Sequence, residues 1–292
     1  MHNIFYEAMK NVSDIEFLEL LCRAEHEPII NGVTMPSFPD KGIQEMFVGS
    51  SGGATLRGEG WLFYNMIKES TCKFKNPITS NTKILDFGCG WGRMIRFFFK
   101  DVVEENIYGV DVNPYMIQVC KETLGLGNYE VTPSAPPTEF NNDTFDIIFA
   151  YSVFSHLNER LTTQWVKEFS RILRPNGILI ATTHGEPFLS FVKDLQSGTV
   201  AAATAWHEGI RDIFTPVNEF IERYNNGEFI FADTYASERK DSEDNGYAEY
   251  GDTLISEAYA RNELGKYLLY RDFIPAGAQL PQSTFILQKD EK

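Results

Sequence analysis

The sequence predicts an α/β protein built around a doubly wound parallel sheet. Between about residues 81 and 184, short apolar runs alternate with segments whose apolar residues recur at helical spacing. This alternation is typical of parallel strands joined by right-handed helical crossovers. Residues 145–151 are almost continuously apolar, as expected for a strand buried on both faces of such a sheet.

Five strands are expected in this region, and most are followed by a helix. The strands are residues 83–87, 107–110, 129–132, 145–151 and 177–183. The helices are residues 93–100, a segment around 116–120 and residues 158–173. Pro175 and Gly177 end the last helix, because proline disfavours a helical residue before it and glycine supplies a turn.

The segments that flank this region differ from it in pattern. Residues 1–80 have helical periodicity, and Ser13 with Glu16 forms a capping-box signature. After residue 184 the alternation breaks, and Thr215 and Pro216 are expected at the N-cap and first position of a helix. Ser256 is expected to cap another.

The chain therefore divides into four expected parts. A charged stretch at residues 238–245 is predicted to be an exposed loop, and two late strands are expected at residues 268–274 and 283–288. The four parts are an N-terminal helical cap (1–80), an α/β core (81–184), an inserted substrate cap (185–265) and C-terminal strands that complete the sheet (266–292).

Charge excludes two classes of partner. The 292 residues include 41 Asp and Glu but 26 Lys and Arg, so the formal net charge is −15. A surface this acidic repels phosphate backbones and anionic headgroups. We therefore expect no nucleic-acid and no membrane partner.

The number and spacing of the cysteines indicate the cellular compartment and whether a zinc site is expected. The four cysteines lie far apart and form no CxxC pair, so neither a zinc site nor a disulfide framework is expected; they are Cys22, Cys72, Cys89 and Cys120. Free thiols suit a reducing compartment, and the first residues lack the pattern of a signal peptide. A cytoplasmic location is expected.

A glycine-rich turn follows the first strand of the core. Gly88, Gly90 and Gly92 let the backbone bend sharply and let a ligand approach the main chain. The dinucleotide fingerprint needs its third glycine three residues after the second, and that position is Arg93. The turn therefore departs from the pattern that binds a pyrophosphate.

Two acidic residues flank the turn and restrict the kind of ligand that it can bind. Asp86 lies two residues before Gly88, where a carboxylate repels a pyrophosphate but suits an amino group or a positive charge. Asp111 ends the second strand, where an acid can accept both hydroxyls of a ribose, although such an acid is also a common helix N-cap. An adenosine ligand with a cationic tail and no phosphate matches S-adenosylmethionine.

On these residues the chain resembles the class I S-adenosylmethionine-dependent methyltransferases. Residues 84–92 are similar to the family's first motif, 107–113 to its acidic loop, 144–157 to its fourth strand and the loop after it, and 173–177 to the turn into its fifth strand. The resemblance implies a Rossmann-like seven-stranded doubly wound sheet, with an N-terminal helical cap and an inserted cap between strands five and six.

The resemblance also implies a cofactor, S-adenosyl-L-methionine, and the residues that bind it. Ser134 stands where the family often has an acid near the adenine. The implied binding residues are Asp86, Gly88, Cys89, Gly90, Gly92, Asp111, Val112, Ser134, Ala135 and Tyr151.

Two histidines are candidates for catalysis. His184 ends the fifth strand, at the carboxyl edge where open α/β sheets bind ligands. His156 lies in the loop after the fourth strand. Either side chain could act as a general base or make only an orienting hydrogen bond.

The function expected is methyl transfer to a small-molecule acceptor, by O-methylation of a saccharide or secondary metabolite. The aromatic residues of 185–270 could line the acceptor pocket, although aromatic residues more often form core. Two alternatives remain: an NAD(P)-dependent oxidoreductase, disfavoured by Asp86 and Arg93, and a non-catalytic cofactor-binding protein on the same fold.

Overall fold

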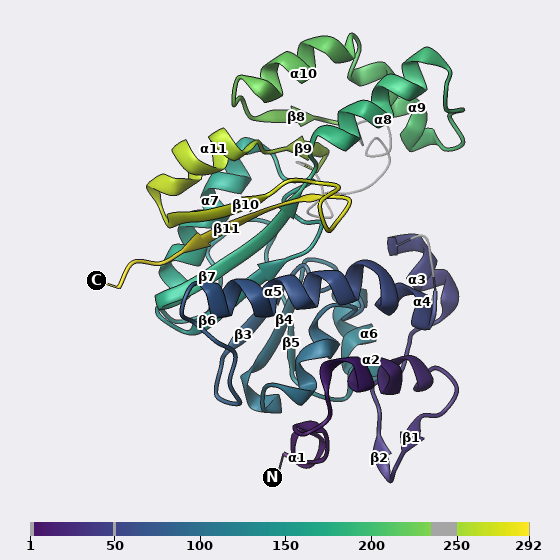
Figure 1. Ribbon diagram of the computed structural model, residues 1–292, viewed down its shortest axis with the longest axis vertical. Coiled ribbons are helices and arrows are strands. Elements are labelled where there is room, and N and C mark those ends of the chain that lie inside the picture. The colour runs from purple at the N-terminus through teal and green to yellow at the C-terminus, as the bar shows by residue number, and fades with distance from the viewer. Residues whose placement is uncertain (1–2, 49–50, 235–249, 292) are drawn as a thin grey trace. The chain divides into compact units, whose positions relative to one another are not determined.

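The computed structural model describes residues 3–48, 51–234 and 250–291 of the chain (Figure 1). The predicted loop at residues 238–245 lies outside the described residues. The chain divides into two compact units. The first comprises residues 1–132, 141–151 and 176–178, and the second comprises residues 133–140, 152–175 and 179–292.

Seven strands form one sheet in the order β10-β11-β7-β6-β3-β4-β5. They are β3 (Ile84–Phe87), β4 (Ile107–Asp111), β5 (Asn128–Val131), β6 (Phe145–Ala150), β7 (Leu173–Thr183), β10 (Leu269–Ile274) and β11 (Ser283–Gln288). β3 pairs in parallel with β4 and β6, β4 pairs in parallel with β5, and β10 and β11 are antiparallel. The predicted Rossmann-like seven-stranded fold is confirmed.

The first unit begins with helices and one short hairpin. Its elements before the sheet are α1 (Ile4–Met9), α2 (Asp14–Arg23), β1 (Ile29–Ile30), β2 (Val33–Thr34), α3 (Lys41–Val48), α4 (Gly53–Thr55), the π-helical η1 (Leu56–Gly60) and α5 (Trp61–Lys73). The predicted capping box opens α2, because the Ser13 hydroxyl accepts from the Glu16 N–H and the Glu16 carboxylate accepts from the Ser13 N–H. Sequence periodicity missed the β1–β2 hairpin, since each strand has only two residues.

An aromatic core joins α5 to the sheet within this unit. The Phe63 ring lies 5.9 Å from that of Phe149 on β6, and Tyr64 stacks on Phe97 at 5.2 Å. Phe97 and its neighbour Phe98 are buried. These contacts hold the N-terminal helices against the strands that carry the glycine-rich turn.

The prediction of a helix over residues 93–100 is wrong in the extent and the type of the helix. The structure has turns up to Met94 and a 3-10 helix, η2 (Ile95–Lys100), whose six residues are all buried. Such a segment has no solvent face, so the apolar spacing could not reveal its geometry. η3 (Glu104–Asn106) and α6 (Pro114–Leu124) complete the unit's helices; Asn113 rather than Asp111 caps α6, by accepting from the Tyr115 N–H.

The second unit contains the remaining helices and a small two-stranded sheet. Its elements are α7 (Glu159–Ile172), α8 (Glu186–Ser197), α9 (Ala205–Ile213), α10 (Val217–Asn225), β8 (Ile230–Ala232), β9 (Asp252–Leu254), α11 (Glu257–Asn262) and η5 (Leu264–Lys266). The predicted caps Asn158 and Ser256 accept from the N–H groups of Leu161 and Tyr259.

The helices that follow β7 have a hydrophobic core of their own. Buried residues of α8, α9, α10, β8 and β9 pack together, among them Phe188, Val192, Ile210, Phe214 and Leu254. Figure 1 shows α8, α9 and α10 grouped with β8. A core of this kind explains why the strand–helix alternation stops after β7.

The predicted N-cap at Thr215 is wrong. Pro216 occupies the N-cap position of α10, and the Thr215 hydroxyl donates to the Arg211 carbonyl at 2.8 Å and accepts from Gln196. The fifth strand is longer than predicted. It begins at Leu173 instead of residue 177.

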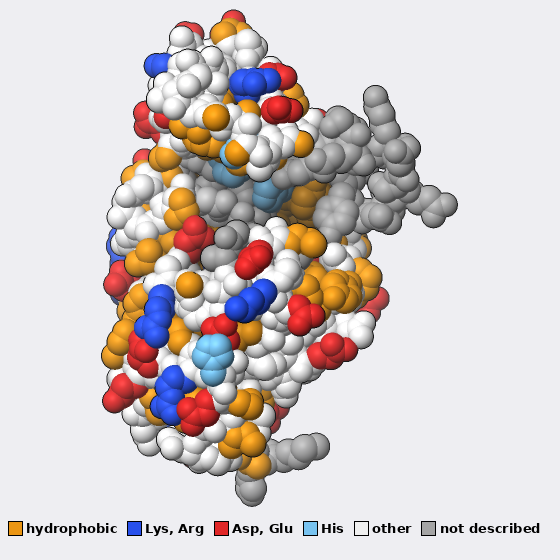
Figure 2. Space-filling model, turned by 90° about the vertical axis from the view of Figure 1, so that its right-hand side faces the viewer, with side chains coloured by type: hydrophobic (Ala, Val, Ile, Leu, Met, Phe, Trp, Pro, Cys, Tyr) orange, Lys and Arg blue, Asp and Glu red, His pale blue; other side chains and the backbone are white. Residues whose placement is uncertain are grey.

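Within the described ranges no helix is long and apolar enough to cross a membrane. On the face that Figure 2 draws, Asp and Glu side chains are spread among fewer Lys and Arg side chains.

Candidate active site

The glycine-rich turn between β3 and η2 adopts backbone angles that favour glycine. Gly88, Gly90 and Gly92 have φ values of 75°, 52° and 78°. At Gly92 a Cβ atom would lie 2.4 Å from the Leu124 side chain, so packing also requires glycine there. At Gly90 the space that a Cβ would occupy is open. A ligand can therefore approach the main chain closely at Gly90.

Asp111 holds this turn in place from the end of β4. Its carboxylate oxygens accept from the Gly90 N–H and the Asn113 N–H, both at 2.9 Å. Burial raises the pKa of Asp111, although these backbone hydrogen bonds oppose the rise. Because an ionised carboxylate has about four acceptor positions, the side chain retains capacity for the two hydroxyls of a ribose.

Asp86 is a buried carboxyl, and one of its oxygen atoms lacks a hydrogen-bond partner among the described residues. That atom is Oδ2, and the side chain is 1% exposed. Burial raises the pKa of Asp86 well above its usual value, and Asp111 raises it further, against a backbone hydrogen bond from Ile95 and the charge of Arg93. An ammonium group, such as that of S-adenosyl-L-methionine, would satisfy this oxygen. The residues at the turn therefore fit that cofactor.

Asp86→Asn is expected to weaken binding of S-adenosylhomocysteine about tenfold or more, because the ammonium loses a charged partner. The unliganded variant should be at least as stable as the wild type. A carboxyl whose pKa is raised on folding contributes stability below its unfolded value of about 3.9, and that contribution is lost as pH rises through the folded pKa. The advantage of asparagine should therefore grow between pH 5 and pH 8, as measured by Tm.

Calorimetry in two buffers of different ionisation enthalpy provides a second measurement. Binding of the ammonium should lower the raised pKa of Asp86, so the wild type should release more protons on binding than Asp86→Asn does. Glu122→Gln, an exposed substitution on α6, is the control. Equal affinity and equal proton release in the wild type and Asp86→Asn would remove Asp86 from the cofactor site.

Other residues predicted to bind the cofactor fall into two groups. In the first unit, Cys89 is buried with its Sγ 4.0 Å from that of Cys120, and Val112 is partly exposed after Asp111. Tyr151 follows β6, and its hydroxyl donates to Glu59 at 2.8 Å. Ser134 and Ala135 lie in the loop after β5, within the part assigned to the second unit.

The two candidate histidines lie together in the second unit. Their ring centroids are 6.0 Å apart with nearly perpendicular planes. His184 Nε2 lies 3.0 Å from Asp252 Oδ1, and the His184 ring stacks on Phe188 at 4.3 Å. His156 Nδ1 lies 2.9 Å from the Gly251 carbonyl oxygen. Both histidine side chains thus contact the same short segment, Gly251 and Asp252, the first residue of β9.

Asp252 is the acid that organises this cluster. Its side chain is fully buried, and its Oδ2 atom accepts from Trp206 Nε1 at 3.0 Å and from the Thr234 hydroxyl at 2.6 Å. Burial alone would raise the pKa of Asp252, but the hydrogen bond from His184, the two imidazoles and the bond from Thr234 bring it below its usual value. Asp252 is therefore ionised at neutral pH and accepts the Nε2 proton of His184.

The partners of His184 were missed in the sequence. Asp252 is 68 residues from His184, and Trp206 and Thr234 are 46 and 18 residues from Asp252. No spacing motif connects them, because β9 brings Asp252 to the cluster by pairing with β8 and by bridging His184 at Leu254. In the described part of the chain, no group of three or more His, Cys, Asp or Glu side chains is placed to hold a metal ion.

Comparisons with known proteins bear on the sheet region. Residues 84–177 match the family described as "Methyltransferase domain". Ubiquinone biosynthesis O-methyltransferase of Pelagibacter ubique is 25% identical over 130 residues, which cover 44% of this chain and 52% of that protein. Malonyl-(acyl-carrier protein) O-methyltransferase of Halalkalibacterium halodurans is 30% identical over 110 residues, covering 35% and 39%. The chain thus spans about half or less of the length of these relatives.

A solved structure supports the fold. The magnesium protoporphyrin IX methyltransferase of Synechocystis PCC 6803, with bound S-adenosylhomocysteine, has a TM-score of 0.50 at 11% identity. The similarity covers 84% of this chain and 92% of that one. At this identity the match shows a shared fold.

The strand order and the family match together define the class of the sheet region, which is a methyltransferase domain. Residues 84–177 belong to the class I S-adenosylmethionine-dependent methyltransferases. The predicted family is confirmed for this region, and the cofactor of that family is S-adenosyl-L-methionine.

Proposed function

We propose that this protein transfers a methyl group from S-adenosyl-L-methionine to a hydroxyl of a small-molecule acceptor, with His184 as the general base. The observation that carries the proposal is the hydrogen-bonded pair of His184 and Asp252. In the first unit, Asp86, the glycine-rich turn and Asp111 hold the cofactor. Two relatives named as O-methyltransferases support the choice of oxygen as the atom methylated.

The need for a base follows from the chemistry of the acceptor. S-adenosyl-L-methionine supplies a methyl group already activated on a sulfonium, so alignment contributes much of the rate. When the new carbon–oxygen bond forms, the alcohol proton must leave, because a protonated ether is a strong acid. A positioned side chain that takes this proton should contribute about 10²–10⁴-fold.

His184 is better suited to this role than His156. Asp252 accepts the Nε2 proton of His184, which leaves Nδ1 as the basic nitrogen and stabilises the imidazolium once the proton arrives. Burial lowers the pKa of His156, and the nearby His184 lowers it further. His156 therefore stays neutral and holds a proton poorly. Its Nδ1–H donates to the Gly251 carbonyl, and this hydrogen bond fixes the orientation of the His156 ring.

The acceptor is proposed to be a saccharide or a secondary metabolite, covered by the inserted segment 185–265. This segment supports the role of a substrate cap because it has its own hydrophobic core and contributes Trp206 to the histidine cluster. Release of S-adenosylhomocysteine can be measured with a panel of sugars and phenols and with matched amines. The proposal expects turnover with hydroxyl acceptors, and turnover confined to amines would contradict it.

Trp206→Phe is expected to lower kcat about three- to tenfold without changing cofactor affinity. Asp252 loses one of the hydrogen bonds that fix its carboxylate, and a single such bond contributes about 0.5–1.5 kcal/mol. The KM for the acceptor should change little, because Trp206 acts on the base through Asp252. Phe191→Leu, which removes a ring stacked near Trp206, is the control. Equal kcat in the two variants would exclude a role for Trp206 through Asp252.

A further inference from the structure

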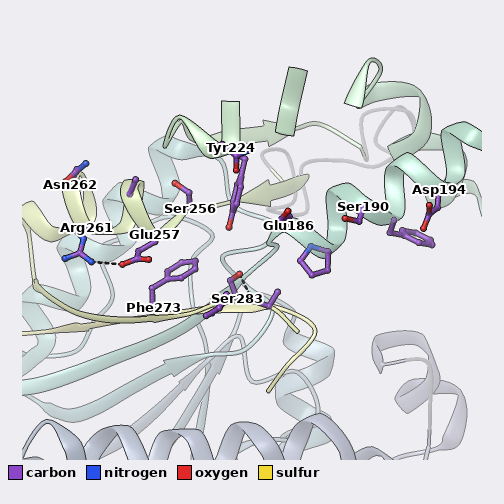
Figure 3. Close-up of a pocket in the computed structure, with 16 residues that line it drawn as sticks. Glu186, Ser190, Asp194, Tyr224, Ser256, Glu257, Arg261, Asn262, Phe273 and Ser283 are labelled. Atoms are coloured by element: carbon purple, nitrogen blue, oxygen red, sulfur yellow. Dashed lines mark hydrogen bonds and ion pairs between the residues drawn. The ribbon is translucent and has the colours of Figure 1, made fainter. Parts of the chain in front are cut away.

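A cavity of about 810 Å³ opens in the second unit among α8, α10, α11 and the β10–β11 hairpin (Figure 3). Its volume lies within the range of pockets that bind small molecules. His156, His184 and Asp252 are not among the residues that line it. The cavity is therefore distinct from the histidine cluster.

Helix α8 separates the cavity from the histidine cluster. Glu186, Ser190 and Asp194 recur at intervals of four residues and present one face of the helix to the cavity. Phe188 and Val192 occupy another face and are buried in the core, where Phe188 stacks on His184. A ligand in the cavity would meet these polar residues of α8 together with Pro187 and Phe191, but not Phe188.

Two aromatic side chains project into the cavity from different elements. Figure 3 shows Tyr224 extending from α10 and Phe273 extending from β10 toward the same space. Both are partly buried, so their rings are held in place and retain accessible faces. Aromatic faces of this kind attract cations and pack on the apolar edges of ligands.

The charges of the lining are unbalanced. Glu257 is hydrogen-bonded to Arg261, whose guanidinium also lies 4.2 Å from the Tyr270 ring centroid. Of the described residues that line the cavity, Arg261 is the only cationic one. Glu186 and Asp194 form no ion pair with any described residue, so their two carboxylates remain available to a ligand.

Neutral polar groups complete the lining. Ser190 and the amides of Asn225 and Asn262 can donate and accept hydrogen bonds. We propose that this cavity is a binding site for a small organic cation, a protonated amine carried on a hydroxylated body. The ammonium lies beside the Glu186 carboxylate and the aromatic faces, Asp194 adds negative charge further along α8, and the hydroxyls bond to the serine and amide groups. The site does not depend on methyl transfer.

Saturation-transfer NMR at pH 6.0 with three probes tests the chemistry directly. D-glucosamine carries the amine, D-glucose has the same hydroxylated ring without it, and D-glucuronate carries a carboxylate instead. We expect a millimolar dissociation constant for glucosamine, as suits so small a ligand, binding of glucose at least tenfold weaker, and no binding of glucuronate. Equal binding of glucosamine and glucose would overturn the proposal.

Variants of the lining residues test whether glucosamine binds in this cavity. Glu186→Gln combined with Asp194→Asn should weaken glucosamine binding about tenfold and remove its advantage over glucose. Glu219→Gln combined with Glu222→Gln removes the same charge from exposed positions of α10 outside the lining and should have no effect. Phe273→Leu keeps an apolar side chain but removes the ring, and should weaken binding about two- to thirtyfold. Unchanged binding in the Glu186–Asp194 variant, or an equal loss in its control, would overturn the proposal.

Discussion

His184→Ala is expected to lower kcat by about 10²–10⁴-fold while leaving the affinity for S-adenosylhomocysteine nearly unchanged. The variant removes the nitrogen that takes the acceptor proton, whereas the residues at the glycine-rich turn are untouched. Steady-state kinetics and calorimetry with the product cofactor measure both effects.

The other histidines provide the comparison for this prediction. His207 lies on α9 outside the cluster, so His207→Ala should keep the kcat of the wild type. If His184→Ala retains full kcat, His184 is not the base. His156→Ala then shows whether the role passes to His156 or whether the acceptor needs no base.

Asp111→Ala is expected to weaken cofactor binding by about 1.5–3 kcal/mol, which is roughly 10- to 150-fold. Two ribose hydroxyls lose a charged acceptor, and the Gly90 N–H loses the oxygen that holds the turn. Asp111→Asn keeps one carbonyl oxygen and should lose less. Calorimetry with S-adenosylhomocysteine measures the affinity, and circular dichroism confirms that the variants are folded.

The control for Asp111 is Glu122→Ala, an exposed carboxylate on the neighbouring helix α6. This variant should bind the cofactor as the wild type does. Unchanged affinity in a folded Asp111→Ala protein would contradict the assignment of Asp111 to the ribose.

The arrangement of the candidate cofactor-binding residues was predictable because the features that determine it are local in sequence. Asp86, Gly88, Gly90 and Gly92 lie within seven residues of one another, and the strand before them has a continuous apolar pattern. Asp111 follows from the next strand, whose register with β3 brings Val110 beside Phe87. Parallel strands therefore carry their terminal residues to the same edge without further information.

The acceptor side was predictable only in part, because its contacts are distant in sequence. His184 was found from its place at the end of β7, but Asp252 reaches it through the pairing of β8 and β9, two strands of three residues each. Strands this short leave almost no alternation to detect. The Thr215 side chain likewise forms hydrogen bonds with Arg211 and Gln196. These contacts depend on the tertiary structure, so local capping preferences do not predict them.

The central claim is transfer of a methyl group from S-adenosyl-L-methionine to the oxygen of a small molecule. The most direct measurement incubates the protein with a mixture of hydroxylated small molecules and cofactor whose methyl group carries deuterium and carbon-13, followed by mass spectrometry and NMR. The account predicts products that gain one labelled methyl group, with the carbon-13 shift of a methoxy group, and much less of these products with Asp111→Ala at a cofactor concentration that does not saturate the variant. Labelled products whose methyl group is bound to nitrogen or carbon, or no labelled product from a protein that binds the cofactor, would contradict it.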